Sequence, residues 1–102
     1  MPTVDELYDE HDQLKSDGKL EEAVAKLNEA LSIDEDFALA HSALAVLCGR
    51  LNKHEDAIRH GLKVCELEPN AAFSFTALSV TYQRAGRIPE AEDAMARAQT
   101  MR

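Results

Sequence analysis

Apolar side chains recur along this chain at steps of three and four residues, with polar residues between them. The spacing is plainest in the middle of the sequence, at Leu44, Leu47, Leu51, Ile58, Leu62 and Cys65. Such steps place side chains on one face of an α-helix, because a helical turn takes about 3.6 residues. The whole pattern predicts six helices, at residues 4–16, 20–33, 38–50, 54–67, 72–84 and 88–101.

The same arrangement of small, apolar and turn residues returns every 34 positions. Alanines align without gaps at Ala23, Ala57 and Ala91, and turn residues stand five positions earlier at Gly18, Asn52 and Gly86. A small residue lets two helices approach closely, whereas a large one pushes their axes apart. We therefore expect each alanine where the two helices of a hairpin cross. A single hairpin cannot bury its apolar face, so the three hairpins must stack.

A 34-residue period held over three helical hairpins resembles the tetratricopeptide repeat (TPR) family, and the resemblance covers essentially the whole chain. It implies an all-α fold, an α-solenoid in which three helix-turn-helix hairpins form a right-handed superhelical stack. The repeats would form one domain and occupy about residues 4–37, 38–71 and 72–102. The resemblance also implies that the first helix of each pair lines a concave groove, which binds peptides or partner helices.

Two residues depart from the family pattern. His11 replaces the usual small residue of the first repeat, and Gly61 stands where a large apolar residue is usual. Glycine lowers helix propensity by about 1 kcal/mol relative to alanine, so we expect some close packing to depend on Gly61.

Both ends of the array are more polar than its middle. Glu92 and Gln99 replace apolar residues of the earlier repeats, as do Glu10 and Gln13 at the N-terminal end. Because terminal repeats need a polar outer face, we expect the three repeats to form a complete array. Some apolar residues remain at the C-terminal end, and they either pack on their own hairpin or support self-association: Ala94, Met95, Ala98 and Met101.

By the same resemblance, the groove-facing residues come from the first helices of the three pairs. The predicted partner-binding residues are Tyr8, Asp12, Leu39, Ser42, Val46, Arg50, Phe73, Thr76, Val80 and Arg84. Asp5, Asp9 and Asp12 make the groove acidic at its start. Its middle is apolar, which suits the apolar stripe of a helix or an extended peptide. Phe73 is the best single anchor for such a segment, unless it packs between the repeats instead.

Two sets of positions bear on whether the groove binds an anionic group. Arg50 and Arg84 are 34 positions apart and should lie side by side on adjacent helices. They either bind one carboxylate or phosphate between them or are solvated and paired with nearby acids. Chaperone-binding members of the family hold a C-terminal carboxylate with Lys, Asn and Arg side chains. None of these types occupies the matching positions, which are Tyr8, Asp12, Ala43, Phe73 and Ala77, so we expect no such clamp.

The chain carries a formal net charge of −8, unevenly distributed. Residues 4–37 hold 12 acidic and 3 basic residues, residues 38–71 are balanced, and residues 72–102 carry a net charge of +1. The acidic end would steer basic partners toward it, and an acidic chain is a poor binder of nucleic acid. The first residues lack the features of a secretory signal and no apolar stretch has membrane-spanning length, so we expect neither a signal nor a membrane span. We expect a cytoplasmic protein whose Cys48 and Cys65 are free thiols.

No catalytic or metal-binding motif accompanies the repeat. The four histidines lack metal-binding spacing, and His41 is expected to be a packed side chain. We therefore predict no enzymatic activity and no cofactor. The sequence predicts a protein–protein interaction module, an adaptor, scaffold or small co-chaperone, that binds a peptide or protein with basic and apolar residues. The alternative is a structural TPR protein that self-assembles as a homo-oligomer.

Overall fold

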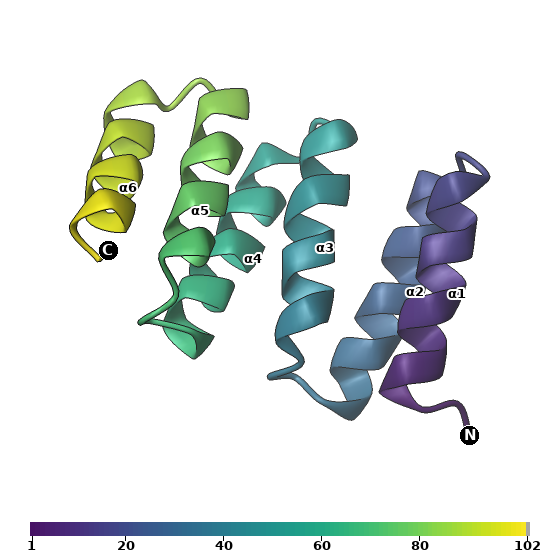
Figure 1. Cartoon of the computed structure of the whole chain (residues 1–102). Coiled ribbons are helices and arrows are strands. Elements are labelled where there is room, and N and C mark those ends of the chain that lie inside the picture. The colour runs from purple at the N-terminus through teal and green to yellow at the C-terminus, as the bar shows by residue number, and fades with distance from the viewer. Residues whose placement is uncertain (102) are drawn as a thin grey trace.

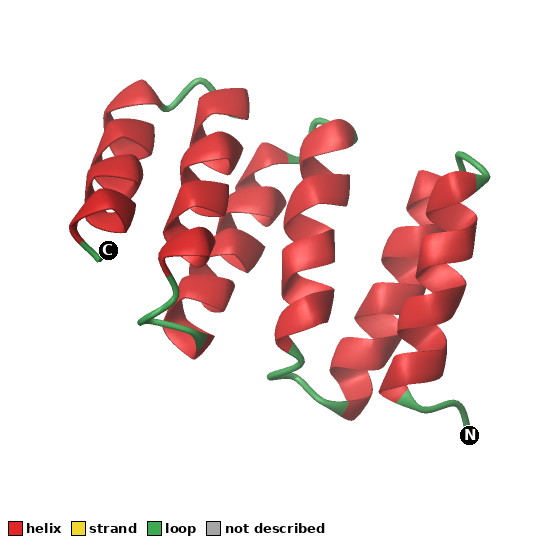
Figure 2. Cartoon of the chain, viewed as in Figure 1, coloured by secondary structure: helices red, strands yellow, loops and turns green. Residues whose placement is uncertain are grey.

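The computed structural model of the chain describes residues 1–101, which form six α-helices joined by short turns and contain no strand (Figures 1 and 2). The helices are α1 (Val4–Ser16), α2 (Leu20–Ile33), α3 (Ala38–Arg50), α4 (His54–Leu67), α5 (Ala72–Arg84) and α6 (Ile88–Thr100). The first five have the bounds that the sequence predicts, and α6 ends one residue earlier. The predicted all-α solenoid is therefore confirmed. None of the helices in residues 1–101 is long and apolar enough to cross a membrane.

Local signals explain where the helices begin and turn. Thr3 and Glu6 form a capping box at the start of α1, in which each side chain accepts a hydrogen bond from the other residue's backbone N–H. The turns inside the three pairs contain Gly18, Asn52 and Gly86, with φ angles of 77°, 62° and 79°. This left-handed conformation ends the first helix of each pair, and glycine and asparagine tolerate it best.

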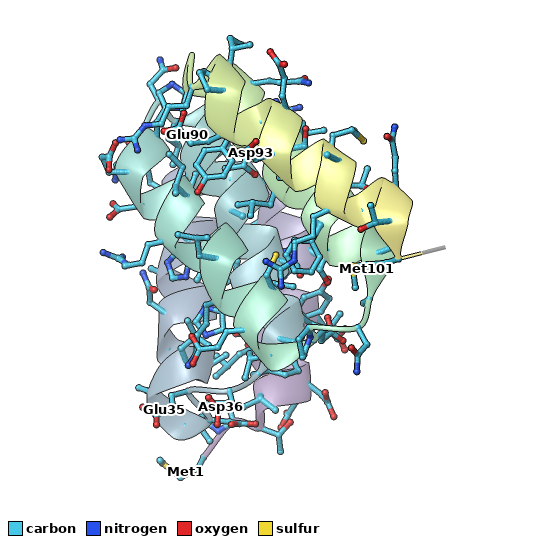
Figure 3. All side chains as sticks on the ribbon, turned by 90° about the vertical axis from the view of Figure 1, so that its left-hand side faces the viewer. Met1, Glu35, Asp36, Glu90, Asp93 and Met101 are labelled. Atoms are coloured by element: carbon cyan, nitrogen blue, oxygen red, sulfur yellow. The ribbon has the colours of Figure 1, made fainter. Side chains whose placement is uncertain are left out.

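The six helices form a stack that measures 41 × 26 × 19 Å (Figure 1). Each odd-numbered helix packs on the helix that follows it, and α2 and α4 then pack on the next pair through α3 and α5. The turns inside the pairs lie along one edge of the stack, and the connections between the pairs lie along the other (Figure 1). Figure 3 shows this division from the side, with Glu35 and Asp36 at one edge and Glu90 and Asp93 at the opposite edge.

The predicted alanines occupy matching buried positions. Ala23, Ala57 and Ala91 are all buried in the second helices of the three pairs. In the third pair Ser79 Oγ of α5 donates a hydrogen bond of 2.9 Å to the carbonyl oxygen of Ala91 in α6, so the two helices touch at this point. His11 holds the position of Ser79 in the first pair and is also buried, at 1% exposure. The close approach of paired helices therefore depends on a small residue in the second helix.

Gly61 lies where α4 packs against α5. A Cβ atom at this position would come within 3.1 Å of Leu78 Cδ1, so the missing side chain brings the two helices close. The buried face of α4 includes Ala57, Gly61 and Val64. Leu62, which the sequence pattern assigned to the apolar stripe, is instead 46% exposed, and that assignment was wrong. One step along a helix is a rotation of about 100°, which turns Leu62 away from α5.

Candidate functional site

A hollow of about 370 Å³ opens between α3, α4 and α5, and we refer to it as the groove. Six of the predicted partner-binding residues line it: Ser42, Val46, Phe73, Thr76, Val80 and Arg84. The first two come from α3 and the other four from α5. Residues four and three positions apart on α5 share one helix face, which explains why Phe73, Thr76 and Val80 all reach the groove.

Two glycines keep the groove open. A Cβ atom on Gly49 of α3 would lie 3.9 Å from Arg84 Cδ, and one on Gly61 of α4 would lie 3.1 Å from Leu78 Cδ1. Both glycines line the groove, and a side chain at either position would enter this space. Neither glycine was among the residues predicted to line the groove. Glycine inside a helix lowers the stability of that helix. This unfavourable residue type was the sequence signal that could have identified the two positions.

Large apolar side chains stand exposed in and beside the groove. The exposed fractions are 80% for Phe73, 54% for Leu39, 50% for Val46 and 40% for Val80. On the same helix α3, Leu44 and Leu47 are fully buried. Helix α3 therefore has two apolar faces, one packed in the core and one unpacked. Exposed apolar surfaces of this kind mark interaction sites.

The groove is built by the second and third helix pairs. Four predicted residues do not line it: Tyr8, Asp12, Leu39 and Arg50. Tyr8 is half-buried and packs edge-on against Phe37, with ring centroids 6.1 Å apart. Asp12 forms an ion pair of 3.3 Å with Lys15. The other two are exposed at the two ends of α3.

Arg50 and Arg84 are the last residues of α3 and α5. Arg84 passes beside Gly49 and lines the groove, whereas Arg50, the next residue after Gly49, does not line it. Within residues 1–101 neither arginine takes part in an ion pair. Five of the other described cations have acidic partners within 4.0 Å, namely Lys15, Lys26, Arg59, Lys63 and Arg87. The two arginines therefore carry charge that the described chain does not neutralise by direct contact.

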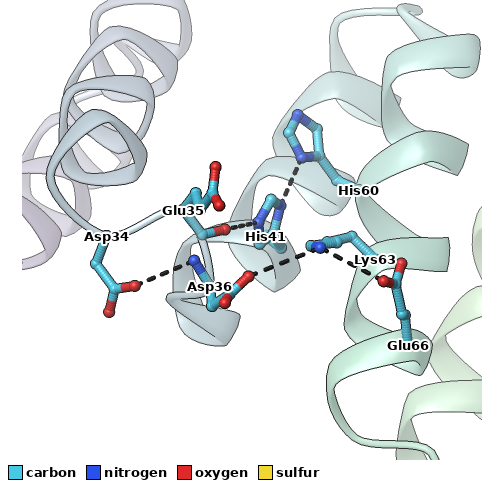
Figure 4. A network of polar contacts seen from close by, with 7 residues as sticks. All are labelled: Asp34, Glu35, Asp36, His41, His60, Lys63 and Glu66. Atoms are coloured by element: carbon cyan, nitrogen blue, oxygen red, sulfur yellow. Dashed lines mark hydrogen bonds and ion pairs between the residues drawn. The ribbon is translucent and has the colours of Figure 1, made fainter.

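A second polar cluster lies outside the groove, where α3 meets α4 (Figure 4). The buried imidazoles of His41 and His60 face each other, with their Nδ1 atoms 2.9 Å apart. Beside them Lys63 Nζ lies 3.7 Å from Asp36 and 3.6 Å from Glu66. Burial, and then the neighbouring His41 and Arg59, lower the pKa of His60 to about 4. The packed state predicted for His41 is confirmed, but its partner lies 19 residues away and was missed.

Within the described residues, side chains of the types that bind metal ions or act as nucleophiles lie apart or are buried. Within residues 1–101, His, Cys, Asp and Glu side chains form no group of three or more that could hold a metal ion. Cys48 and Cys65 are free and buried, and burial raises the pKa of both thiols. A buried thiol with a raised pKa is a poor nucleophile.

Residues 12–52 match the profile of a protein family described as TPR repeat. No curated protein sequence matches the chain.

Solved structures with this fold cover nearly all of the chain. The second TPR of Spaghetti (RPAP3), bound to the HSP90 peptide SRMEEVD, superposes with a TM-score of 0.85 at 17% identity and covers 98% of this chain and 93% of its own. YrrB, described as a TPR protein with an unusual peptide-binding site, gives a TM-score of 0.88 at 20% identity. MamA superposes with a TM-score of 0.88 at 17% identity.

These similarities differ in how much of each relative they cover. The match includes 100% of this chain but 53% of YrrB, and 97% of this chain but 58% of MamA. The chain therefore spans little more than half the length of these two proteins. At such identities the shared property is the fold.

Proposed function

We propose that the chain is a tetratricopeptide repeat protein and that it is a protein–protein interaction module that binds a peptide or a partner helix in its groove. The three repeats, residues 4–37, 38–71 and 72–102, would act as one non-catalytic binding unit. The role that fits is that of an adaptor, a scaffold or a small co-chaperone.

The observation that carries this proposal is the exposed apolar surface at the groove. Phe73, Val46 and Val80 are large, exposed and close to one hollow, although each adjoins a well-packed helix face. Removing one such side chain from water contributes about 1.5–3 kcal/mol. A partner with an apolar stripe would recover this free energy, because it would cover several of these side chains at once.

Two TPR structures with the same fold support a peptide as the ligand. One holds the HSP90 peptide SRMEEVD, and another is described as having a peptide-binding site. The mode of binding proposed here is different from a chaperone-tail clamp, because Tyr8, Asp12, Ala43, Phe73 and Ala77 supply no cation at the clamp positions. The acids at the start of α1 would also repel an acidic tail and attract basic flanking residues.

A displayed peptide library tests the proposal directly. Peptides selected on the purified protein should lose binding about tenfold or more when Phe73→Ala and Val46→Glu are combined, because the variant loses an apolar anchor and places a carboxylate in the groove. The matched control is Leu62→Glu, which puts the same charge on an exposed leucine outside the groove. Circular dichroism should show that both variants remain helical. Equal binding to the groove variant, or equal losses in both, would refute the groove as the binding surface.

A second candidate function is self-assembly. A smaller hollow of about 330 Å³ lies on the outer side of α6 and is lined in part by Ile88, Ala91 and Met95. The N-terminal end of a second copy would be the occupant, because residues 4–37 are strongly acidic and residues 72–102 carry a net positive charge. Light scattering across protein and salt concentrations tests this candidate. A mass that rises with protein concentration beyond that of a dimer, because head-to-tail contacts do not close, and that returns to the monomer value with Met95→Glu, would support it. A monomer under all conditions would remove it.

A further inference from the structure

The groove carries opposite charges at its two ends. Arg84, the last residue of α5, lines one end. Glu68 also lines the groove and lies at the other end, because its carbonyl oxygen accepts a hydrogen bond from the backbone N–H of Ala71, the N-cap of α5. Helix α5 has 13 residues, so at 1.5 Å per residue these two ends are separated by about 18 Å. An extended chain crosses this distance in about five to six residues.

A second arginine, Arg50, lies just outside the groove lining at this end. Arg50 ends α3 next to Gly49, over which the Arg84 side chain passes. Among residues 1–101 neither arginine has an acidic partner within 4.0 Å, whereas Lys63 and Arg87 each contact two acids. Unpaired guanidinium groups at one end of an apolar hollow attract an anionic group of the ligand.

The helix ends indicate which anion fits. Both arginines stand at C-terminal ends of helices, where backbone carbonyl oxygens carry partial negative charge. Phosphate groups are bound by the N–H groups of helix N-termini, and none of these supplies the positive end of the groove. A carboxylate side chain needs no such N–H groups, because a guanidinium group can hold it through two parallel hydrogen bonds.

We propose that the ligand of the groove is an extended peptide segment of about six residues that has apolar side chains in its middle, a basic side chain at the Glu68 end and an Asp or Glu side chain at the Arg84 end. This inference rests on the proposed function, because it specifies the ligand of the same groove. Val46 and Val80 would contact the apolar middle, Glu68 would pair with the cation, and Arg50 and Arg84 would pair with the carboxylate.

Four synthetic peptides test the charge pattern. KSLLSE, KSLLSK, ESLLSE and QSLLSQ share one apolar middle, and all are acetylated and amidated so that only side chains carry charge. Chemical-shift titration of the ¹⁵N-labelled protein measures weak binding to each. KSLLSE should bind about three- to tenfold more tightly than the other three, because it alone satisfies both charged ends.

Charge reversal in the protein should exchange the preference. With Arg84→Glu, KSLLSK should become the tightest ligand, and with Glu68→Lys, ESLLSE should. QSLLSQ serves as the control, since its affinity should stay within about twofold in both variants because it carries no charge to gain or lose. Two unlike responses from two surface substitutions cannot arise from a general loss of stability.

Three outcomes would overturn the inference. The first is equal binding of all four peptides that still depends on Phe73 and Val46, which would leave the proposed groove function intact. The second is a preference that survives both charge reversals. The third is tighter binding of QSLLSQ with a free C-terminus than of KSLLSE, which would assign the arginines to a chain-terminal carboxylate. Failure of the library-selected peptides to depend on the groove would instead refute the proposed function itself.

Discussion

The Nδ1 atoms of His41 and His60 lie 2.9 Å apart, so one hydrogen bond joins α3 to α4 through two buried imidazoles (Figure 4). His41 Nε2 lies 2.8 Å from the carbonyl oxygen of Glu35 and must donate to it, because a carbonyl only accepts. With one proton on the His41 ring, its Nδ1 is therefore bare and accepts a hydrogen bond from the Nδ1–H of His60. A second proton on the pair would bring two Nδ1–H groups face to face and would add a positive charge to a buried site.

This geometry makes stability depend on pH between about 4 and 6.5. Burial, His41 and Arg59 lower the pKa of His60 from 6.5 to about 4, and Asp56 opposes them. The unfolded chain therefore takes up its proton at a higher pH than the folded protein. The neutral state of His60 therefore contributes fully to the free energy of unfolding above about pH 6.5. Roughly 2–3 kcal/mol of this contribution is lost as the pH falls to about 4.

Urea titrations over this pH range, on the wild type and on His60→Gln, measure the effect. Glutamine can donate a hydrogen bond to His41 but does not titrate. The free energy of unfolding of the variant should fall less steeply below pH 6.5. Parallel curves for the two proteins would mean that His60 is protonated equally in the folded and unfolded chains.

Because α4 and α5 approach closely at Gly61, we predict that this position accepts only a small side chain. Gly61→Leu should lower the free energy of unfolding by about 1–3 kcal/mol, because a side chain there must displace Leu78. Gly61→Ala is the matched control. Its gain in helix propensity, about 1 kcal/mol, should offset much of the crowding by one methyl group. Chemical denaturation measures both, and a leucine variant as stable as the alanine variant would show that α4 and α5 separate freely.

A related limit applies at the contact between Ser79 and Ala91. Ser79→Ala should change the free energy of unfolding by no more than about 1 kcal/mol, because it recreates the Ala45–Ala57 pair of the second repeat. Ser79→Leu should cost about 1–3 kcal/mol, since the position is fully buried against α6. Thermal or urea unfolding measures both variants. If Ser79→Leu is more stable than Ser79→Ala, the requirement for small residues at this crossing is wrong.

The two cysteines should be protected from thiol reagents. Cys48 and Cys65 are buried, and burial raises the pKa of each thiol, so little thiolate forms at neutral pH. We expect 5,5′-dithiobis(2-nitrobenzoic acid) to modify the folded protein at least about a hundredfold more slowly than a free thiol. Both should react rapidly in guanidinium chloride, and rapid reaction without denaturant would show that the helices carrying them open readily.

Much of the fold could be predicted from local pattern. The positions of Ala23, Ala57 and Ala91 and the turn residues five positions before them predicted helix pairs whose bounds the structure confirms almost throughout. The exposed apolar side chains on α3 and α5 were predicted from the resemblance to the TPR family, and residues 34 positions apart meet the same surroundings in each unit.

The sequence by itself determined the six helices and the buried alanines. These depend on helical periodicity and on glycine or asparagine at left-handed turns, which are properties of neighbouring residues. Only the tertiary structure decided that His41 meets His60, that Leu62 is exposed, and that Gly49 and Gly61 open a hollow with Glu68 at one end and Arg84 at the other. The physical reason is that these contacts depend on how far each helix is rotated against the next. That rotation is set by side chains that pack between the repeats, and it cannot be predicted from the spacing of the repeats.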